Sequence, residues 1–397
     1  MKNHLTRTRM AWLTLVGMMA ALSWGAYAAG SNETWLRTYA GSEYGAFFDI
    51  TPADSQNVVV VGATYHALGS TSLGDVLVAE LTLSGDIVWK KTYGGKAHDQ
   101  GLYVQKMDDG GYLVLGETES EGAGGRDLYL LHVDATGGLI WERTLGGAGE
   151  DWAKDMIKLA DGGFLLVSES NSFGPGYDTY VVRLDAAGDE VWSTILDSGA
   201  NESGSAALEG ANGNLYVLAT ISYDGGSSQQ YRDTRMYCLD ENGNQLWTTL
   251  YHDDDIKQAG DDMAWTQDGN IVIAGLSAKQ SSGAELLDFW LARVDASTGD
   301  LQWSLSEGSQ YADDYGIALS PELDGSYVVA GLGPGFPLLR FTEDGSVTWL
   351  RRGTTDTHTY AGFAVLELAD GGFLIPGFKY LNTYGDTFDA VLLHFVE

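Results

Sequence analysis

One sequence unit recurs along this chain, and a tryptophan marks each of its copies. Successive copies lie 46 to 56 residues apart, and their tryptophans are Trp35, Trp89, Trp141, Trp192, Trp247, Trp303 and Trp349. A unit of this length that repeats without interruption predicts a closed repeat architecture, in which each copy buries its apolar faces against its neighbours. The repeat extends from about residue 34 to residue 397. We therefore expect one large module rather than several separate domains.

Each copy has the hydrophobic period of β-strands. Short segments rich in β-branched and aromatic residues, such as 112–116 (YLVLG) and 164–168 (FLLVS), are bounded by turn residues. Tight turns that tolerate positive φ are expected to join the first strand to the second, at Asp109-Gly110, Asp161-Gly162, Asn212-Gly213, Asp268-Gly269, Asp324-Gly325 and Asp370-Gly371. A D-x-x-G turn or a close variant is expected to join the third strand to the fourth, at Asp134 with Gly137, Asp185 with Gly188, Asp240 with Gly243 and Asp295 with Gly299. In each of these the Gly stands four positions before the Trp.

These features predict an all-β fold, a seven-bladed β-propeller whose blades are four-stranded antiparallel meanders. The chain opens with the strand that carries Trp35 and ends with a third strand, residues 391–396, that no fourth strand follows. We expect the strand around Trp35 to complete the last blade and close the ring, because an unclosed ring would leave unpaired sheet edges.

The first 28 residues have the pattern of a secretory signal peptide. A basic head precedes an apolar run over residues 10–24, and the small residues Ala26 and Ala28 follow. We expect cleavage after Ala28, no membrane insertion of the remaining propeller (residues 29–397), and a location in the periplasm or outside the cell. The alternative is a membrane anchor, but the apolar run is shorter than the roughly 20 residues that a membrane-spanning helix needs.

The chain is strongly acidic, with 55 acidic residues against 22 basic ones and a formal net charge of −33. Such a surface repels nucleic acid and anionic membranes and favours cations or basic partners. General solubility is the competing explanation of the same charge. Cys238 is the only cysteine, so an internal disulfide is excluded and stability must come from packing.

The stretch from Val294 to Trp303, VDASTGDLQW, resembles the tryptophan-docking motif of quinoprotein-like propellers, a group that includes outer-membrane assembly lipoproteins. The D-G-G-Y/F turns and the W-x-x-T-x-G-G stretches at residues 89–95 and 141–147 are similar to repeats of secreted bacterial and archaeal propellers without an assigned role. The resemblance implies the architecture and says little about activity. Quinone-dependent dehydrogenases of the wider family generally have eight blades and often a vicinal cysteine pair. This chain has seven copies and one cysteine, so we do not expect a bound quinone.

The copies differ most in the links from the second strand to the third. We expect these links on one face of the propeller and the short Asp-Gly and D-x-x-G turns on the other. Loops that vary on a rigid frame commonly carry binding sites, which makes the loop-rich face the candidate functional face. Its candidate binding residues are Tyr65, His66, Tyr177, Tyr223 and Tyr231.

Acidic or amide residues recur where the innermost strand of each copy is expected to begin, ten residues before the Asp-Gly turn. They are Asp99, Asp151, Glu202, Gln258 and Asp314. Four residues beyond this position, three copies carry Asp49, Asp155 and Asp262. If several of these carboxylates face the axis, a hard cation such as Ca²⁺ would relieve their repulsion, so the latter three are candidate metal ligands. The competing explanation is that such aspartates accept hydrogen bonds from nearby main-chain amides.

Two functions are open from the sequence. The first is a secreted, non-catalytic binding or scaffold propeller that recognises a protein, peptide or glycan through its acidic, loop-rich face. The second is a carbohydrate-active enzyme, a glycoside hydrolase or polysaccharide lyase, with Asp99, Asp151, Asp155 and Asp262 as candidate catalytic acids. We favour the first, because the sequence carries no nucleophile elbow, P-loop or dinucleotide-binding motif in the context that such motifs need.

Overall fold

The computed structural model describes residues 33–40, 45–64, 74–223, 231–253, 256–279, 287–308, 313–354, 358–368, 372–380 and 388–396. The predicted signal peptide, residues 1–28, lies outside these residues, as do Tyr65 and His66. All regular secondary structure in the described parts of the chain is β-strand. Over the same residues there is no helix of the length and apolar character needed to cross a membrane.

Five four-stranded antiparallel sheets, each a meander of consecutive strands, make up most of the fold. The first two comprise β2 (Ala46–Pro52), β3 (Asn57–Ala63), β4 (Val76–Thr82) and β5 (Ile87–Tyr93), then β6 (Asp99–Lys106), β7 (Tyr112–Thr118), β8 (Asp127–Val133) and β9 (Leu139–Leu145). The third comprises β10 (Asp151–Lys158), β11 (Phe164–Ser170), β12 (Asp178–Leu184) and β13 (Glu190–Leu196). The fourth comprises β14 (Asn201–Glu209), β15 (Leu215–Tyr223), β16 (Tyr231–Leu239) and β17 (Gln245–Tyr251). The fifth comprises β18 (Ile256–Trp265), β19 (Ile271–Lys279), β20 (Leu287–Val294) and β21 (Leu301–Glu307).

A sixth sheet has nine strands and brings the two ends of the chain together. Its strands are β22 (Tyr315–Pro321), β23 (Ser326–Pro334), β24 (Pro337–Thr342), β25 (Val347–Arg352), β26 (Thr359–Gly362), β27 (Leu366–Glu367), β28 (Phe373–Tyr380), β29 (Phe388–Phe395) and β1 (Glu33–Tyr39). β22 to β25 form one meander, and a short ladder between β23 and β26 connects it to the other strands. β1 pairs antiparallel with β29, with Trp35 opposite His394.

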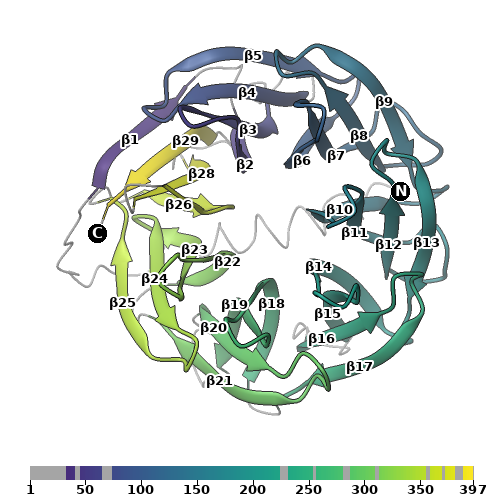
Figure 1. Ribbon diagram of the computed structural model, residues 1–397, viewed down its shortest axis with the longest axis vertical. Coiled ribbons are helices and arrows are strands. Elements are labelled where there is room, and N and C mark those ends of the chain that lie inside the picture. The colour runs from purple at the N-terminus through teal and green to yellow at the C-terminus, as the bar shows by residue number, and fades with distance from the viewer. Residues whose placement is uncertain are drawn as a thin grey trace.

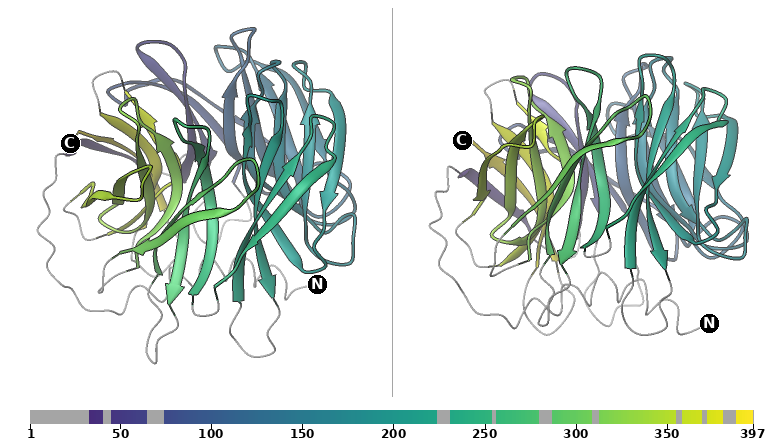
Figure 2. Two further views of the ribbon diagram at one scale, coloured as in Figure 1. Left: turned by 60° about the horizontal axis from the view of Figure 1, so that its bottom comes forward. Right: turned by 90° about the horizontal axis from the view of Figure 1, so that it is seen from below.

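The sheets are arranged around a common axis (Figure 1). The first strand of each meander, such as β6, β10 or β14, lies nearest the centre, and the fourth strand lies on the outside. Seen from the side, the inner strands run roughly along this axis (Figure 2). This is the arrangement of a β-propeller, as the repeat predicts.

The tryptophan of one sheet packs on a turn of the next. Gly137, in the turn between β8 and β9, has a φ of 76°, and a Cβ built on it would lie 2.7 Å from Cζ3 of Trp89. Glycine is therefore required there both for its conformation and for the close approach of the ring. Equivalent contacts join Gly188 to Trp141, Gly243 to Trp192, Gly299 to Trp247 and Gly345 to Trp303. The tryptophans thus help to hold neighbouring sheets together.

Apolar side chains fill the space between neighbouring sheets. In one cluster, Val61 of β3 packs with Val104 of β6 and Val114 of β7, and each is at most 1% exposed. Six of the inner strands also carry a β-bulge, as between Ala153 and Asp155 of β10. A bulge adds a residue and changes the direction of the side chains that follow. The bulges lie where the candidate functional residues concentrate.

Candidate functional site

Asp99 and Asp151 begin the innermost strands β6 and β10, and both are fully buried. Oδ2 of Asp99 accepts a hydrogen bond from the amide of Gly95 at 2.7 Å, and Oδ2 of Asp151 accepts one from the amide of Gly147 at 2.9 Å. A serine hydroxyl donates to the same oxygen in each case. These carboxylates fasten the glycine-rich segment that precedes each strand, and neither has exposed surface at which a substrate could react.

Glu202 and Asp314 occupy the equivalent position in two other copies and are also buried. Glu202 accepts a hydrogen bond from the hydroxyl of Tyr237 at 2.6 Å. Asp314 is held by both terminal nitrogens of Arg352, with Nη2 at 2.8 Å from Oδ2. The acids at the start of the inner strands therefore serve as anchors for neighbouring segments.

Asp49, Asp155 and Asp262 follow the bulges of β2, β10 and β18. In each of them Oδ1 accepts a hydrogen bond from the amide of the next residue, at 2.7 to 2.8 Å. The amides that donate to Oδ2 come from the neighbouring sheet, at 2.7 to 2.8 Å, and belong to Val104, Ala207 and Leu319. Each carboxyl thus bridges two sheets through main-chain hydrogen bonds.

These three carboxyls influence one another although they come from three non-adjacent sheets. Burial raises the pKa of Asp49 to about 7, that of Asp155 to about 8 and that of Asp262 to about 7. Repulsion from Asp262 adds to the rise at Asp49 and Asp155, and the amide hydrogen bonds oppose it. The side chains keep intermediate solvent exposure even though protein surrounds them. Among the described residues, no three His, Cys, Asp or Glu side chains come together in a way that could hold a metal ion.

Tyr103 of β6 lies within reach of the same charges. Burial, followed by the charges of Asp155 and Asp49, raises the pKa of its phenol well above 10. Its hydroxyl donates a hydrogen bond to the main-chain carbonyl of Lys154. The phenol therefore stays protonated at neutral pH, where it is poorly suited to remove a proton from a substrate.

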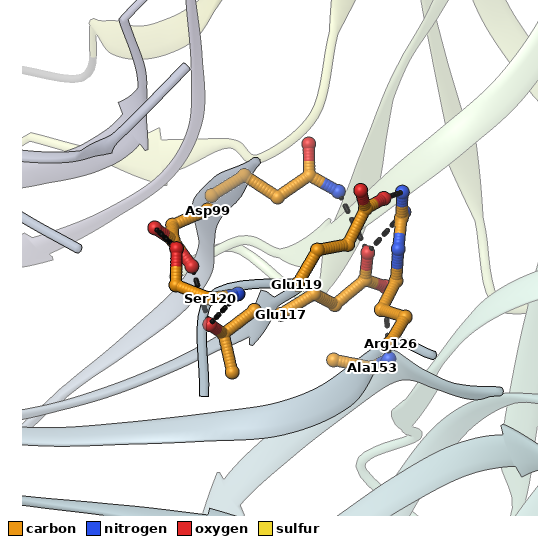
Figure 3. A network of polar contacts seen from close by, with 8 residues as sticks. Asp99, Glu117, Glu119, Ser120, Arg126 and Ala153 are labelled. Carbon is orange, nitrogen blue, oxygen red and sulfur yellow. Dashed lines mark hydrogen bonds and ion pairs between the residues drawn. The ribbon is translucent and has the colours of Figure 1, made fainter. Parts of the chain in front are cut away.

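A buried ion-pair network lies where β7 ends and β8 begins (Figure 3). Arg126 donates through Nη1 to Glu117 at 2.8 Å and through Nη2 to Glu119 at 2.6 Å. Glu117 also accepts a hydrogen bond from the amide of Ala153 in the next sheet, at 3.0 Å. Arg126 is 4% exposed and Glu117 is 3% exposed. The guanidinium carbon of Arg126 lies 3.9 Å from the ring centre of Trp152, which is a cation–π contact.

A second set of charged contacts continues onto the next sheets. Lys154, the bulge residue of β10, forms an ion pair with Glu169 at 3.0 Å. Ser203 of β14 donates to the same carboxylate at 2.8 Å. Burial raises the pKa of Glu150, against the opposing charge of Arg126. Polar and charged side chains of three consecutive sheets therefore take part in these two networks, in which Glu117 and Arg126 are buried.

The same position of the second strand carries different residues in the different copies. In six copies this residue pairs with the residue two positions before the bulge of the innermost strand, and in the seventh it pairs with Ala361 of β26. The residues at this position are Ala63, Glu117, Glu169, Thr220, Leu276, Leu332 and Phe378. Leu276, Leu332 and Phe378 belong to an apolar cluster with Ile317 and Phe363. Two consecutive copies therefore place a glutamate where three others place a large apolar side chain.

We name the two contrasting regions by their residues. The polar arc consists of Glu117, Arg126, Trp152, Lys154, Glu169 and Ser203. The apolar arc consists of Phe48, Leu276, Ile317, Phe363 and Phe378; the ring centres of Phe48 and Phe363 are 5.1 Å apart. β10, which carries Trp152 and Lys154, lies across the centre of the ring from β26, which Phe363 follows (Figure 1).

Only one of the five predicted binding residues has a described side chain. Tyr177 is half-buried, and burial followed by the charges of Glu169 and Glu150 raises its pKa, so it borders the polar arc. Tyr223 and Tyr231 pair with each other at the ends of β15 and β16, but their side chains lie outside the described set, as do Tyr65 and His66 in full.

The polar arc is not apparent from the sequence of a single copy. Glu117 and Glu169 each follow a run of strand residues, in YLVLGET and FLLVSES, and their partners Arg126 and Lys154 lie on different elements. Aligning the copies by register would have shown a glutamate in two copies at a position that is apolar in others. That contrast was the available signal.

One protein family matches part of the chain. The family described as outer membrane protein assembly factor BamB matches residues 126–288, which is less than half of the sequence. No curated protein matches the sequence.

Solved structures resemble the whole fold. An ulvan lyase from a polysaccharide lyase family gives a TM-score of 0.54 at 11% identity, over 89% of this chain and 93% of the lyase. The α-L-arabinanase of Penicillium chrysogenum gives 0.51 at 10% identity, over 89% of this chain and 96% of that enzyme. A protein of unknown function from Dyadobacter fermentans gives 0.50 at 12% identity, over 92% and 99% of the two chains. At such identities the likeness concerns the fold alone, and with the family match it identifies this chain as a β-propeller of repeated sheets.

Proposed function

We propose that this protein is an exported, non-catalytic propeller that binds a protein, peptide or glycan near its axis, on the face that carries the variable loops. The polar arc supports this placement, because Arg126 lies in the link between a second and a third strand, where the copies differ. The net charge of −33 disfavours nucleic acid as the ligand.

The proposal rests chiefly on the hydrogen bonds of the candidate catalytic acids, whose carboxyl groups hold main-chain segments of the fold in place. Asp99 and Asp151 are buried and bound to main-chain amides. Both carboxyl oxygens of Asp155 and of Asp262 accept main-chain hydrogen bonds, one of them across a sheet boundary. An acid catalyst needs a carboxyl that reaches the substrate and exchanges a proton with it. The paired charges of the polar arc are better suited to recognition.

We propose further that the nine-stranded sheet contains two blades, which gives seven in all, and that β1 closes the ring. β1 occupies on β29 the place that the fourth strand has in the other sheets. Phe47 and Val60 of the first sheet pack in one cluster with Leu374 and Leu392 of β28 and β29. These contacts support a ring in which the last blade meets the first.

Export rests on the pattern of residues 1–28 and gives a simple test. The basic head, apolar run and small residues are those of a cleaved signal peptide. A partial match to a family named for outer-membrane assembly agrees with a periplasmic location. Mass spectrometry of the exported protein should show an N-terminus at Ala29, and an uncleaved protein would contradict the proposal.

An axial Ca²⁺ near Asp49, Asp155 and Asp262 is a separate proposal, and it requires these side chains to come closer together than they do in this structure. The mutual repulsion of these carboxyls supports it, because a divalent cation would relieve that repulsion. Calorimetric titration of the metal-free protein with CaCl₂ at pH 8 tests it. Binding that disappears in Asp155→Asn is expected, and the absence of any binding heat would refute the proposal.

The competing function is that of a carbohydrate-active enzyme. It is supported by the shared fold of the ulvan lyase and the arabinanase and by the pKa of Asp155, which at about 8 would suit a general acid. The two functions differ in whether the protein converts a polysaccharide into shorter products.

The deciding experiment incubates residues 29–397 with ulvan, arabinan and other polysaccharides and measures new reducing ends and unsaturated uronates. The binding proposal predicts neither product. Turnover that is lost in Asp155→Asn but kept in Glu190→Gln, a change on the exposed outer strand β13, would establish the enzyme instead.

A further inference from the structure

The polar arc and its flanks carry an excess of negative charge. Among the described residues, the four carboxylates of Glu117, Glu119, Glu150 and Glu169 interact with two cations, Arg126 and Lys154. Two negative charges are therefore not balanced within the group when all six side chains are ionised. A ligand with a basic group would balance them, whereas an acidic ligand would be repelled.

Other copies of the unit form the same strands without a charged pair at this position. A buried ion pair is often no more stabilising than apolar side chains of the same volume, because its desolvation offsets its attraction. Other copies of the unit place Leu276, Leu332 or Phe378 at the position of Glu117 and pack well there. A local departure from the rule that the other copies follow is expected at a functional site.

The apolar arc favours a hydrophobic group of the ligand. Phe363 lies 5.1 Å from Phe48 and 5.5 Å from Phe378, measured between ring centres. Ile317, Phe363 and Phe378 are only partly buried, so they retain surface for contact. The arc contains no polar side chain, so it offers a contact surface to an apolar group and no side-chain hydrogen-bond partner.

We propose that the axial surface binds a peptide segment in which a basic side chain and a large hydrophobic side chain stand a few residues apart. The basic side chain faces the partly exposed carboxylates of Glu119, Glu150 and Glu169, and the hydrophobic side chain contacts the apolar arc. This inference rests on the proposed binding function and names the chemistry of its ligand.

A peptide array tests the inference with defined probes. Dodecapeptides carry Lys, Gln or Glu at one position and Phe, Leu or Ser at a second position three to six residues away, and a glycan array is probed in parallel. Dissociation constants of the best peptides are then measured by fluorescence anisotropy. We expect the Lys/Phe and Lys/Leu peptides to bind, and the change of Lys to Glu or of Phe to Ser to weaken binding about tenfold or more.

Two protein variants locate the contacts. Glu169→Gln should reduce the preference for Lys over Gln, and Phe363→Ala should reduce the preference for Phe over Ser, each with little effect on the other preference. Glu190→Gln on β13 is the matched charge control and should change neither. A circular dichroism spectrum and melting temperature close to those of the unmodified protein show that each variant is folded.

Some results would contradict the peptide ligand alone, and others would contradict the proposed binding function as well. Peptides bound equally well with Lys or Glu, or binding that neither variant alters, would refute the inference. Binding to glycans but not to peptides would refute it too and would leave the binding function standing. No binding to either array would refute both.

Discussion

The substitution Asp155→Asn should change the stability of the protein in a way that depends on pH. In the folded protein Oδ1 and Oδ2 of Asp155 accept main-chain hydrogen bonds from Met156 and Ala207, both at 2.7 Å. An asparagine offers only one acceptor oxygen, so one of the two amides is left without a partner. Leaving a buried donor unsatisfied costs about 1 to 3 kcal/mol. We expect this loss at pH 5, where the native carboxyl is protonated in the folded state.

At higher pH the native protein loses stability that the Asp155→Asn variant does not lose, because an asparagine does not titrate. Burial raises the pKa of Asp155 from 3.8 to about 8, so the folded state holds a proton that the unfolded state releases between these values. Stability from this group is therefore greatest below pH 4 and decreases as the pH rises to about 8. Each pKa unit corresponds to about 1.4 kcal/mol, which sets an upper limit of roughly 6 kcal/mol for the whole interval. The actual loss is smaller because the carboxyl keeps part of its hydration.

Urea unfolding of residues 29–397 and of the Asp155→Asn variant at pH 5, 7 and 9, with EDTA present, measures both effects. We expect the variant to be less stable at pH 5 and the difference to shrink or reverse at pH 9. Glu190→Gln serves as the control, and its effect should be small at every pH. A difference between the native protein and Asp155→Asn that is the same at pH 5 and pH 9 would refute the raised pKa and the reasoning built on it.

Three further predictions concern the frame of the ring. Deletion of residues 33–40 should lower the melting temperature and increase light scattering, because it exposes the edge of β29; an unchanged melting temperature would rule out closure by β1. Gly137→Ala should destabilise the protein more than Gly269→Ala in urea unfolding. Positive φ should cost about 1 to 2 kcal/mol in either variant, but of these two sites only Gly137 would place its new Cβ against a tryptophan ring. Equal losses of stability would contradict the packing of Trp89 on Gly137. Arg126→Met should cost about 3 to 5 kcal/mol by leaving Glu117 buried and unpaired, and Glu117→Leu in the same chain should recover part of it; no recovery would mean that the ion pair is not the cause.

The repeated elements were predictable from the sequence because they depend on local chemistry. The Asp-Gly and D-x-x-G turns need glycine at positive φ, as at Gly110 and Gly137, and this requirement is visible in any single copy. The period-two pattern then defines strands of the right length between the turns. The packing of Trp89 on the next sheet follows from the same spacing.

The candidate site was less predictable because its partners lie on different sheets. The sequence identifies Asp155 as a candidate acid, but the hydrogen bond that it accepts from the amide of Ala207 depends on how two sheets meet. The buried pair of Glu117 and Arg126, and the position of Trp152 against that arginine, also arise only from the folded arrangement. A residue's spacing along the chain predicts its strand and not the neighbour that it meets across a sheet boundary.

Hydrogen exchange of residues 29–397, with and without a Lys/Phe peptide at saturating concentration, is the most direct test that the axial surface on the loop-rich face is the binding site. We predict slower exchange in residues 99–103, 117–126 and 151–155, which carry or adjoin the polar arc. The Asp-Gly turns near Gly110 and Gly162 should show no change, because they lie at the other end of the same strands. Protection of those turns or of the outer strands β9 and β13, or no protection anywhere, would contradict the account.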